Sequence, residues 1–273
     1  MCRWVAYSGA PLPMEELILK PENSLIKQSY SSREGAETTN GDGFGVGWYG
    51  GGVGPGIFRS TEPAWNDRNL ASLTRHICSG LFVAHVRATT GTPIQQTNCH
   101  PFSHGNWLFA HNGLISDYPR IRRELAFAVD PALFPEIEGT TDSELMFHLA
   151  LTFGLEDDVM PALQRMAGFV ETTCRARNIA QPLQMTLALS DGQSLYAVRY
   201  SSIGQSRSLY VSTDMEAMRA FNPNLDLFSD DARAVVSEPL DDMPKLWQRV
   251  PEATALVVAG GHVETQPFEP RHP

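Results

Sequence analysis

The chain has 273 residues, of which 42% are hydrophobic and 19% charged, a composition typical of a globular protein with a sizeable core. Its formal net charge of −10 argues against nucleic-acid binding, because phosphates are bound by clustered Lys and Arg. No apolar run approaches the ~20 residues of a membrane span, no secretory signal opens the chain, and its four cysteines are sparse, so we expect a cytoplasmic protein without membrane contact or disulfides.

The first half of the chain alternates short strands with turns. Residues 2–8 predict a strand, whereas residues 9–42 are rich in Pro, Ser, Thr, Asn and Gly and predict irregular structure apart from a turn around residues 15–19. Residues 43–50 alternate small and aromatic side chains, which indicates another strand. The other elements expected in this half are a helix at residues 66–77 and strands at residues 57–60, 80–88 and 107–111.

The second half is helical at first and then returns to strands. Residues 157–177 give the clearest helix, with an apolar face that begins at Val159, and Asp191-Gly192 is a hairpin signal between two strands. Because no linker interrupts this order, we predict one α+β domain over residues 1–273 with largely antiparallel sheets. The other expected elements are helices at residues 117–127 and 143–153, strands at 184–190, 194–200, 209–212, 234–237 and 254–258, and a loose C-terminal tail at 267–273.

Cys2 follows Met1 directly, and methionine is commonly trimmed before a residue as small as cysteine. Trimming leaves a thiol and a free α-amine on one residue. An unperturbed thiol has a pKa near ~8.5 and an α-amine near ~7.7–8.0, so the amine can accept the thiol proton at neutral pH. This pairs a nucleophile with its own base, as in other N-terminal-nucleophile enzymes. Taken alone, a Met-Cys start favours the alternative that the residue at position 2 is arbitrary, and the motifs further along the chain reverse this balance.

Two segments at the ends of predicted apolar strands carry further chemistry. A guanidinium at Arg87 can hold a carboxylate with two parallel hydrogen bonds, although a solvated arginine at the rim is the alternative. The side-chain amide of Asn112 and the backbone N–H of Gly113 can converge on one oxygen, which is the composition of an oxyanion hole. The alternative for this pair is an ordinary Asn-Gly turn.

Asp142 lies where a helix is expected to begin, and its carboxylate can bind an ammonium group of a substrate. The structural alternative is strong here, because Thr141 and Glu144 fit a capping box and acidic residues favour the first turn of a helix. Together with Cys2 and the two preceding segments, however, the set comprises the parts needed to hold glutamine and attack its side-chain amide.

The chain resembles the class II glutamine amidotransferases, whose glutaminase domain is an N-terminal-nucleophile hydrolase. The matching positions are Cys2, an H-x-R segment that ends at Arg87, an H-N-G segment at residues 111–113 and a T-D-S-E segment at 141–144, all in the family's order. Residues 87–91 and 98–102 look like the stand-alone, YafJ-like branch of this family. The chain departs from many members by having Arg3-Trp4 after the nucleophile and Ala88 after the arginine.

The resemblance implies a fold and a role for each matching residue. The family fold is a four-layer αββα sandwich, and the family chemistry needs no cofactor and no metal. The implied roles are a nucleophile and its α-amine base at Cys2, oxyanion donors at Asn112 and Gly113, a carboxylate clamp at Arg87 with Thr89 or Thr90 nearby, and an ammonium acceptor at Asp142.

Two other patterns do not indicate sites. Residues 45–50 match G-x-G-x-x-G, but more glycines follow instead of the helix that a dinucleotide site needs. The spacing of Cys99, His100, His104 and His111 matches no standard zinc pattern, so no metal is expected.

We therefore predict hydrolysis of the side-chain amide of glutamine or a related γ-glutamyl amide, through a Cys2 thioester that releases glutamate and ammonia or an amine. One alternative is a glutaminase subunit that delivers ammonia to a separate synthase chain, because the residues after 181 leave room only to complete the sandwich. A second alternative is a non-catalytic γ-glutamyl-binding protein, which would follow if Met1 is retained.

Overall fold

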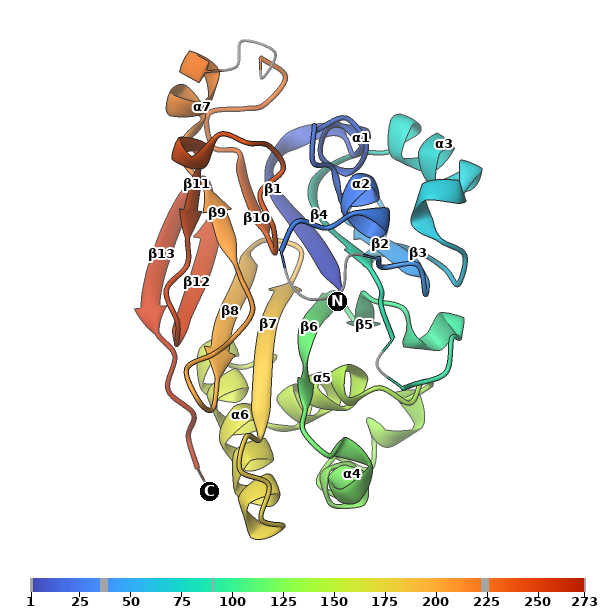
Figure 1. Cartoon of the computed structure of the whole chain (residues 1–273), viewed down its shortest axis with the longest axis vertical. Coiled ribbons are helices and arrows are strands. Elements are labelled where there is room, and N and C mark those ends of the chain that lie inside the picture. Colours follow the sequence, from blue (N-terminus) through green and yellow to red (C-terminus); the bar gives the residue numbers. More distant parts are fainter. Residues whose placement is uncertain (1, 35–38, 90, 222–225, 273) are drawn as a thin grey trace.

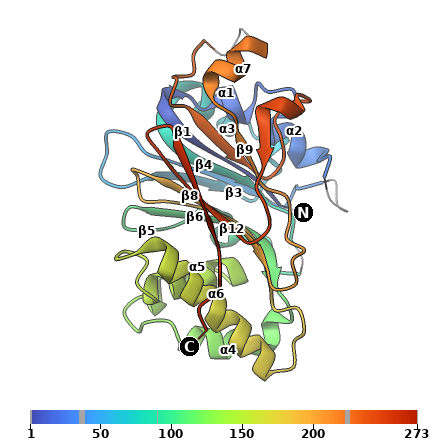
Figure 2. The same ribbon diagram turned by 90° about the vertical axis from the view of Figure 1, so that its left-hand side faces the viewer.

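The computed structural model describes residues 2–34, 39–89, 91–221 and 226–272. These residues form two stacked β-sheets with a layer of helices on each outer face, so the predicted four-layer αββα sandwich is confirmed (Figures 1 and 2). No helix in these ranges is both long enough and apolar enough to cross a membrane.

One sheet has seven strands in the order β11-β9-β10-β1-β4-β2-β3, and its paired neighbours are antiparallel. In its register, Val86 pairs with Arg3 on one side and with Phe44 on the other. The beginnings of β1 and β2 and the end of β4 therefore meet at one end of the sheet. The strands are β1 (Arg3–Pro13), β2 (Phe44–Trp48), β3 (Gly56–Ser60), β4 (Cys78–Val86), β9 (Tyr210–Ser212), β10 (Arg233–Val236) and β11 (Trp247–Arg249).

The other sheet has six antiparallel strands in the order β13-β12-β8-β7-β6-β5. Its strand β6 passes close to the beginning of β1, where the two sheets face each other (Figure 1). The strands are β5 (Phe102–His104), β6 (Trp107–Ile115), β7 (Leu183–Ser190), β8 (Leu195–Ser201), β12 (Thr254–Ala259) and β13 (His262–Pro267).

The helices divide between the two outer faces (Figure 2). Those on the seven-stranded sheet are α1 (Glu15–Ile18), α2 (Leu25–Tyr30), α3 (Arg68–His76) and α7 (Met215–Phe221). Those on the six-stranded sheet are α4 (Tyr118–Phe127), α5 (Asp142–Thr152) and α6 (Val159–Ala176).

Alternation along each strand decides which side chains meet between the sheets. On β1, Val5 packs toward the helices, whereas Trp4 packs toward the other sheet. On β4, Val83 likewise faces the other sheet, where small residues such as Ala110 and Ala188 line the opposing face. Because these side chains are small, the two sheets approach each other closely. A few larger polar groups are then enough to fill one end of the layer between the sheets.

The structure extends and corrects the predicted elements. Strand β6 continues through Asn112 and Gly113 to Ile115, so this pair lies inside a strand and not at its end. Helix α2 occupies part of the region predicted as irregular, because Ser24 caps it by accepting the N–H of Lys27. The short elements β5, β11, β13 and α7 were not predicted.

The segment expected to be a loose tail is packed against the molecule. Phe268 is buried in the core beside α6, and its N–H donates to the carbonyl of Ala253. The N–H of Arg271 donates to the carbonyl of Gln164 in α6. One buried aromatic side chain and two backbone hydrogen bonds therefore fix residues that a sequence rich in proline and charge did not predict to be ordered.

Strand β2 contains glycines because the loop around His100 packs directly against its backbone. Phe44 and Val46 pack on the helix side, while Gly45 and Gly47 face the other way. A Cβ atom at Gly45 would lie 2.2 Å from the carbonyl oxygen of His100. The glycine-rich pattern therefore serves close packing of two backbone segments, in agreement with its interpretation as a strand and not a nucleotide loop.

We predict that Gly45→Ala lowers the free energy of unfolding by about 1–3 kcal/mol, because its methyl group would push the backbone at His100 away from β2. Gly51→Ala is the matched control, since no atom lies within 4 Å of the Cβ position there. Urea denaturation of the two variants measures the difference. Equal midpoints for both would show that this contact does not constrain the fold.

Candidate active site

Cys2 lies just before β1, partly buried beside the end of β4. The N–H of Ala88 donates to the Cys2 Sγ at 3.3 Å, and the thiol donates to the Ala88 carbonyl at 3.4 Å. Burial raises the pKa of the Cys2 thiol, and the Ala88 hydrogen bond and the positive charge of Arg87 oppose that shift only in part. The sulfur therefore depends on a neighbouring base to become a thiolate.

Arg87 follows β4 directly and is 3% exposed, so it is not the solvated rim arginine of the alternative interpretation. Its guanidinium donates to the Thr92 hydroxyl at 2.6 Å, to the Asp42 carbonyl at 3.3 Å and to the Thr89 hydroxyl at 3.4 Å. These acceptors and the carbonyl of Pro93 are all uncharged. A buried cation with neutral partners keeps its attraction for an anion, which is what a carboxylate clamp requires.

The loop after Arg87 is tied to the beginning of β2. The Asp42 carboxylate accepts the N–H of Thr89 at 2.7 Å, and the Thr89 hydroxyl donates to the Thr92 carbonyl at 2.6 Å. Thr89 thus lies next to the guanidinium, as expected, but its described contacts shape the loop. Thr90, the other expected neighbour, lies outside the described residues.

Asn112 and Gly113 lie on β6, opposite β4. Asn112 is 2% exposed, and its side-chain Oδ1 lies 3.1 Å from the Nε2 of His85 on β4. Gly113 has a φ of +148°, and a Cβ atom there would lie 1.9 Å from the carbonyl oxygen of Gln184. The backbone at this point therefore requires glycine, and the Asn-Gly pair is a distortion inside a strand, which excludes the ordinary turn.

Asp142 is the first residue of α5. Its contacts bear on both interpretations of this segment, which are a helix cap and an acceptor for an ammonium group. Thr141 caps the helix by accepting the N–H of Glu144 at 3.2 Å. The Glu144 carboxylate does not complete the capping box, because it accepts the N–H groups of residues 138 and 139 instead. The Asp142 carboxylate accepts the N–H of Ile115 at 2.8 Å, which ties it to β6 two residues beyond Gly113.

These contacts connect the predicted residues across both sheets. Cys2 touches Ala88 next to Arg87, His85 bridges from the same strand to Asn112, and Asp142 bonds the end of the Asn112 strand. Sequence analysis assigned no role to the carboxylate of Asp42 or to His85, although His85 is the first residue of the H-x-R segment. Among the described residues, no group of three or more His, Cys, Asp or Glu side chains is placed to hold a metal ion.

Arg3 occupies a position where the sequence departs from many relatives, and its side chain fixes the start of β1. Its Nε donates to the Glu238 carboxylate at 3.0 Å, and its Nη1 donates to the Cys2 carbonyl at 3.0 Å. Glu238 is 1% exposed and also accepts the backbone N–H groups of Arg33 and Glu34 and the side-chain amide of Asn23. The residue next to Cys2 is thus held by a buried ion pair, and the carboxylate of this pair also accepts hydrogen bonds from three further groups.

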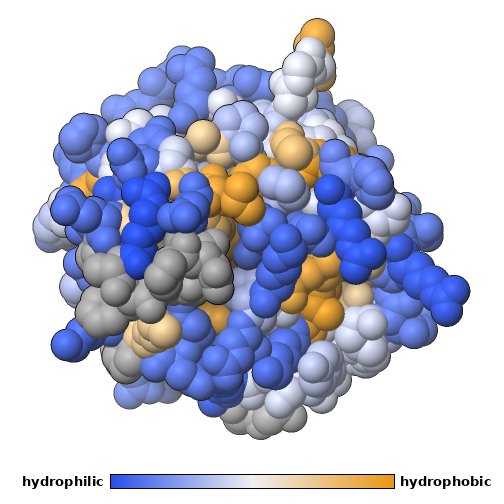
Figure 3. Space-filling view, turned by 90° about the horizontal axis from the view of Figure 1, so that it is seen from above, coloured by the Kyte–Doolittle hydropathy of each residue, from blue (hydrophilic) through white to orange (hydrophobic). Residues whose placement is uncertain are grey.

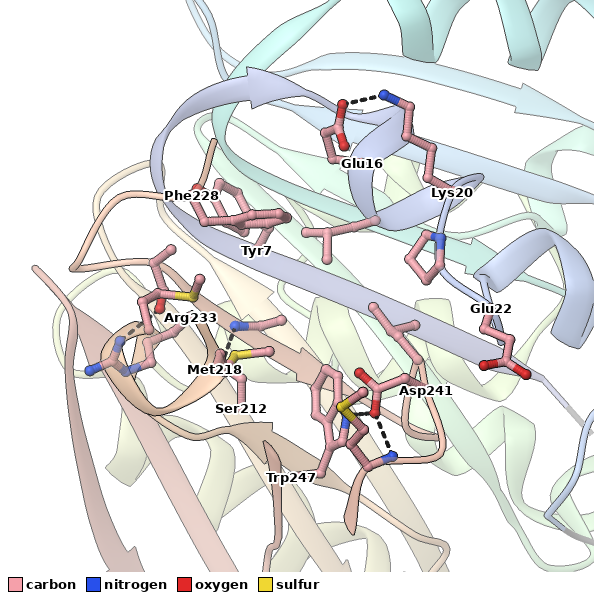
Figure 4. A pocket seen from close by; sticks show the side chains of 17 residues that line it. Tyr7, Glu16, Lys20, Glu22, Ser212, Met218, Phe228, Arg233, Asp241 and Trp247 are labelled. Atoms are coloured by element: carbon pink, nitrogen blue, oxygen red, sulfur yellow. Dashed lines mark hydrogen bonds and ion pairs between the residues drawn. The ribbon is translucent and has the colours of Figure 1, made fainter. Parts of the chain in front are cut away.

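A cavity of about 380 Å³ lies elsewhere, on the outer face of the seven-stranded sheet between α1 and α7 (Figure 4). Tyr7, Met218, Phe228 and Trp247 form much of its apolar wall. None of the predicted site residues lines it. From the end of the molecule that carries α1 and α7, apolar side chains form small patches separated by hydrophilic ones (Figure 3).

Comparison with known proteins identifies the family. The model of the class II glutamine amidotransferases matches residues 20–272. The chain is 30% identical to a probable glutamine amidotransferase of Saccharomyces cerevisiae, over 94% of this chain and 82% of that protein. It is 29% identical to the γ-glutamyl-hercynylcysteine sulfoxide hydrolase of Mycolicibacterium smegmatis, over 98% of this chain and 100% of that protein.

A solved structure agrees with these matches. The glutamine aminotransferase class-II domain protein of Silicibacter pomeroyi has a TM-score of 0.74 and 31% identity, covering 98% of this chain and 100% of that one. The chain therefore belongs to the class II glutamine amidotransferases. It is an amidohydrolase of the N-terminal-nucleophile type, and its relatives support action on γ-glutamyl amides.

We predict that Glu238→Gln lowers the free energy of unfolding by about 3–5 kcal/mol, because it removes the negative charge of the carboxylate from a buried ion pair with Arg3. Asp242→Asn is the control, since it breaks an exposed ion pair with Arg33, and such pairs contribute little. Chemical denaturation of both variants provides the comparison. If Glu238→Gln were as stable as Asp242→Asn, the buried pair would not hold the start of β1.

Proposed function

We propose that Met1 is removed and that Cys2 then hydrolyses γ-glutamyl amides through a γ-glutamyl thioester. The observation that carries this proposal is the position of the Cys2 Sγ against Ala88, beside the buried guanidinium of Arg87 and at the end of the sandwich where Asn112 and Gly113 lie. The relative named as a γ-glutamyl-hercynylcysteine sulfoxide hydrolase supports the choice of a γ-glutamyl bond.

In the proposed reaction the α-amine of Cys2 takes the thiol proton, and the sulfur attacks the γ-carbonyl carbon. The oxyanion that forms accepts hydrogen bonds from the Asn112 side chain and the Gly113 N–H. The C–N bond then breaks, the leaving nitrogen takes the proton from the α-ammonium of Cys2, and a thioester remains. Water, deprotonated by the same amine, attacks the thioester and releases glutamate and the free thiol.

The remaining proposed roles concern binding of the α-carboxylate and the α-ammonium group of the substrate. Arg87 binds the α-carboxylate in place of its present neutral partners, and Asp142 binds the α-ammonium. Thr89 shapes the loop beside the carboxylate, and Thr90 is proposed to act with it. Two opposite charges, one directly after β4 and one at the start of α5, select a free α-amino acid group, so the specificity lies in the γ-glutamyl half of the substrate.

We predict that Cys2→Ala abolishes glutamate release, because no other group replaces the nucleophile. Purified protein is given glutamine and, separately, a panel of γ-glutamyl peptides, and the intact mass is measured in parallel. Loss of one methionine together with turnover supports the proposal, and the best substrate on the panel identifies the leaving amine. Release that is unchanged in Cys2→Ala would disprove the mechanism.

The same panel separates the two alternative functions. Turnover that begins only when a second protein is added would identify a glutaminase subunit that feeds a synthase chain. Full retention of Met1 with binding but no turnover would identify a γ-glutamyl-binding protein.

We predict that Arg87→Lys raises KM for γ-glutamyl substrates with a smaller effect on kcat, because an ammonium cannot make the two-pronged carboxylate contact. Steady-state kinetics with glutamine or the best γ-glutamyl peptide measures both constants. Arg120→Lys is the control, since Arg120 forms an exposed ion pair with Asp117. Kinetics of Arg87→Lys equal to those of the control would remove Arg87 from the substrate site.

A further inference from the structure

The hydrogen bond between His85 and Asn112 crosses the space between the two sheets. His85 is 0% exposed and lies on the face of β4 that also carries Val83, toward β6. Its Nε2 lies 3.1 Å from the Oδ1 of Asn112, which is itself buried. Neither side chain has access to water that could replace this partner, so each one limits the orientation of the other.

The side-chain amide of Asn112 has two chemically different ends. Its oxygen accepts hydrogen bonds, and its NH₂ group donates them. With the oxygen on the Nε2 of His85, the NH₂ group is turned toward other groups and can serve as an oxyanion donor. If the amide were reversed, Asn112 would present an acceptor to the developing negative charge, which would oppose the reaction.

The surroundings of His85 favour a neutral ring that donates through Nε2. Burial, with the charge of Arg87 as a smaller contribution, lowers the pKa of His85 to about 3, so the ring is uncharged at neutral pH. His85 packs on the ring of His100 with centroids 4.2 Å apart. Its Nδ1 has no hydrogen-bond partner in the described part of the chain, and a bare lone pair there is less costly than an unpaired N–H.

We propose that His85 is a positioning residue for the oxyanion hole. Its Nε2–H holds the Oδ1 of Asn112 and thereby aims the Asn112 NH₂ group at the oxygen that becomes negative during attack by Cys2. The ring of His100 packs against the ring of His85. It packs in turn on the ring of Phe102, with centroids 4.6 Å apart. This inference rests on the proposed function and adds a residue that does not touch the substrate.

A role of this kind affects the two kinetic constants differently. The oxyanion exists only during the reaction, so a misdirected Asn112 weakens transition-state stabilisation and leaves binding of the ground state nearly intact. Loss of the His85 hydrogen bond is therefore expected to lower kcat with little change in KM. A merely structural role would instead lower stability or change both constants together.

The experiment compares His85→Leu with His85→Gln in the full-length protein. Leucine fills similar space without a donor, whereas the glutamine amide can donate to the Asn112 oxygen. We expect His85→Leu to lower kcat by about 10–100-fold, less than the ~10²–10³-fold typical for removal of an oxyanion donor, with KM changed less than about twofold. We expect His85→Gln to recover kcat to within about threefold of the native enzyme.

Three results would overturn the proposal. They are an unchanged kcat in His85→Leu, equal losses in the leucine and glutamine variants, and a change confined to KM. In a double-mutant cycle, His85→Leu should have no further effect on kcat in an Asn112→Ala background, because the group that it positions is gone. Additive losses would show that His85 acts independently of Asn112 and would contradict the proposal.

A measurement on the native His85 side chain does not depend on whether these variants fold. Ring ¹⁵N chemical shifts of labelled protein should show His85 as the neutral tautomer protonated on Nε2 throughout pH 5–8. A ring protonated on Nδ1, or one that titrates in this range, would overturn the inference. If Cys2→Ala abolishes turnover while His85→Leu is fully active, only this inference fails, whereas full activity of Cys2→Ala defeats the proposed function itself.

Discussion

The site depends on one constraint, the antiparallel register in which Arg3 pairs with Val86. This register brings Cys2 against Ala88, and the alternation of β4 then turns His85 and Arg87 to the same face, toward the other sheet. A slip by one residue would turn both side chains toward the helices, because successive residues of a strand face opposite sides. The positions of Cys2, Arg87 and His85, for which we propose roles in the reaction, are therefore set by a single strand pairing.

This region combines the buried guanidinium of Arg87 and the carboxylates of Asp42 and Asp142 with several neutral imidazoles. Burial lowers the pKa values of His85, His100 and His111, which leaves three imidazoles uncharged around the end of the inter-sheet layer. Arg87 is the cation beside these imidazoles, and the oxygens to which its guanidinium donates are neutral. Neutral imidazoles leave acid–base work to a group outside the histidines, such as the amine proposed on Cys2.

Much of this arrangement was predictable from local sequence. The helices α4, α5 and α6 were predicted, the last from its apolar face, and the hairpin of β7 and β8 follows from Asp191-Gly192. The motif residues indicated the family. Short elements such as β5 and β11 were missed because three residues contain too little periodicity to read. Sequence alone also could not predict the positive φ of Gly113 or the hydrogen-bond partners of Arg3 and His85. These features depend on residues from distant segments that only the folded chain brings together.

The ion pair between Arg3 and Glu238 joins residues separated by 235 positions in the chain. During translation, the segment that carries Cys2 and Arg3 is therefore made long before the carboxylate of Glu238. Until Glu238 has been synthesised, the buried ion pair between its carboxylate and the Arg3 guanidinium cannot form. The contacts that hold the backbone at Cys2 are therefore complete only after residue 238 has been made, and the order of chain growth delays any reactivity that the finished fold confers on this thiol.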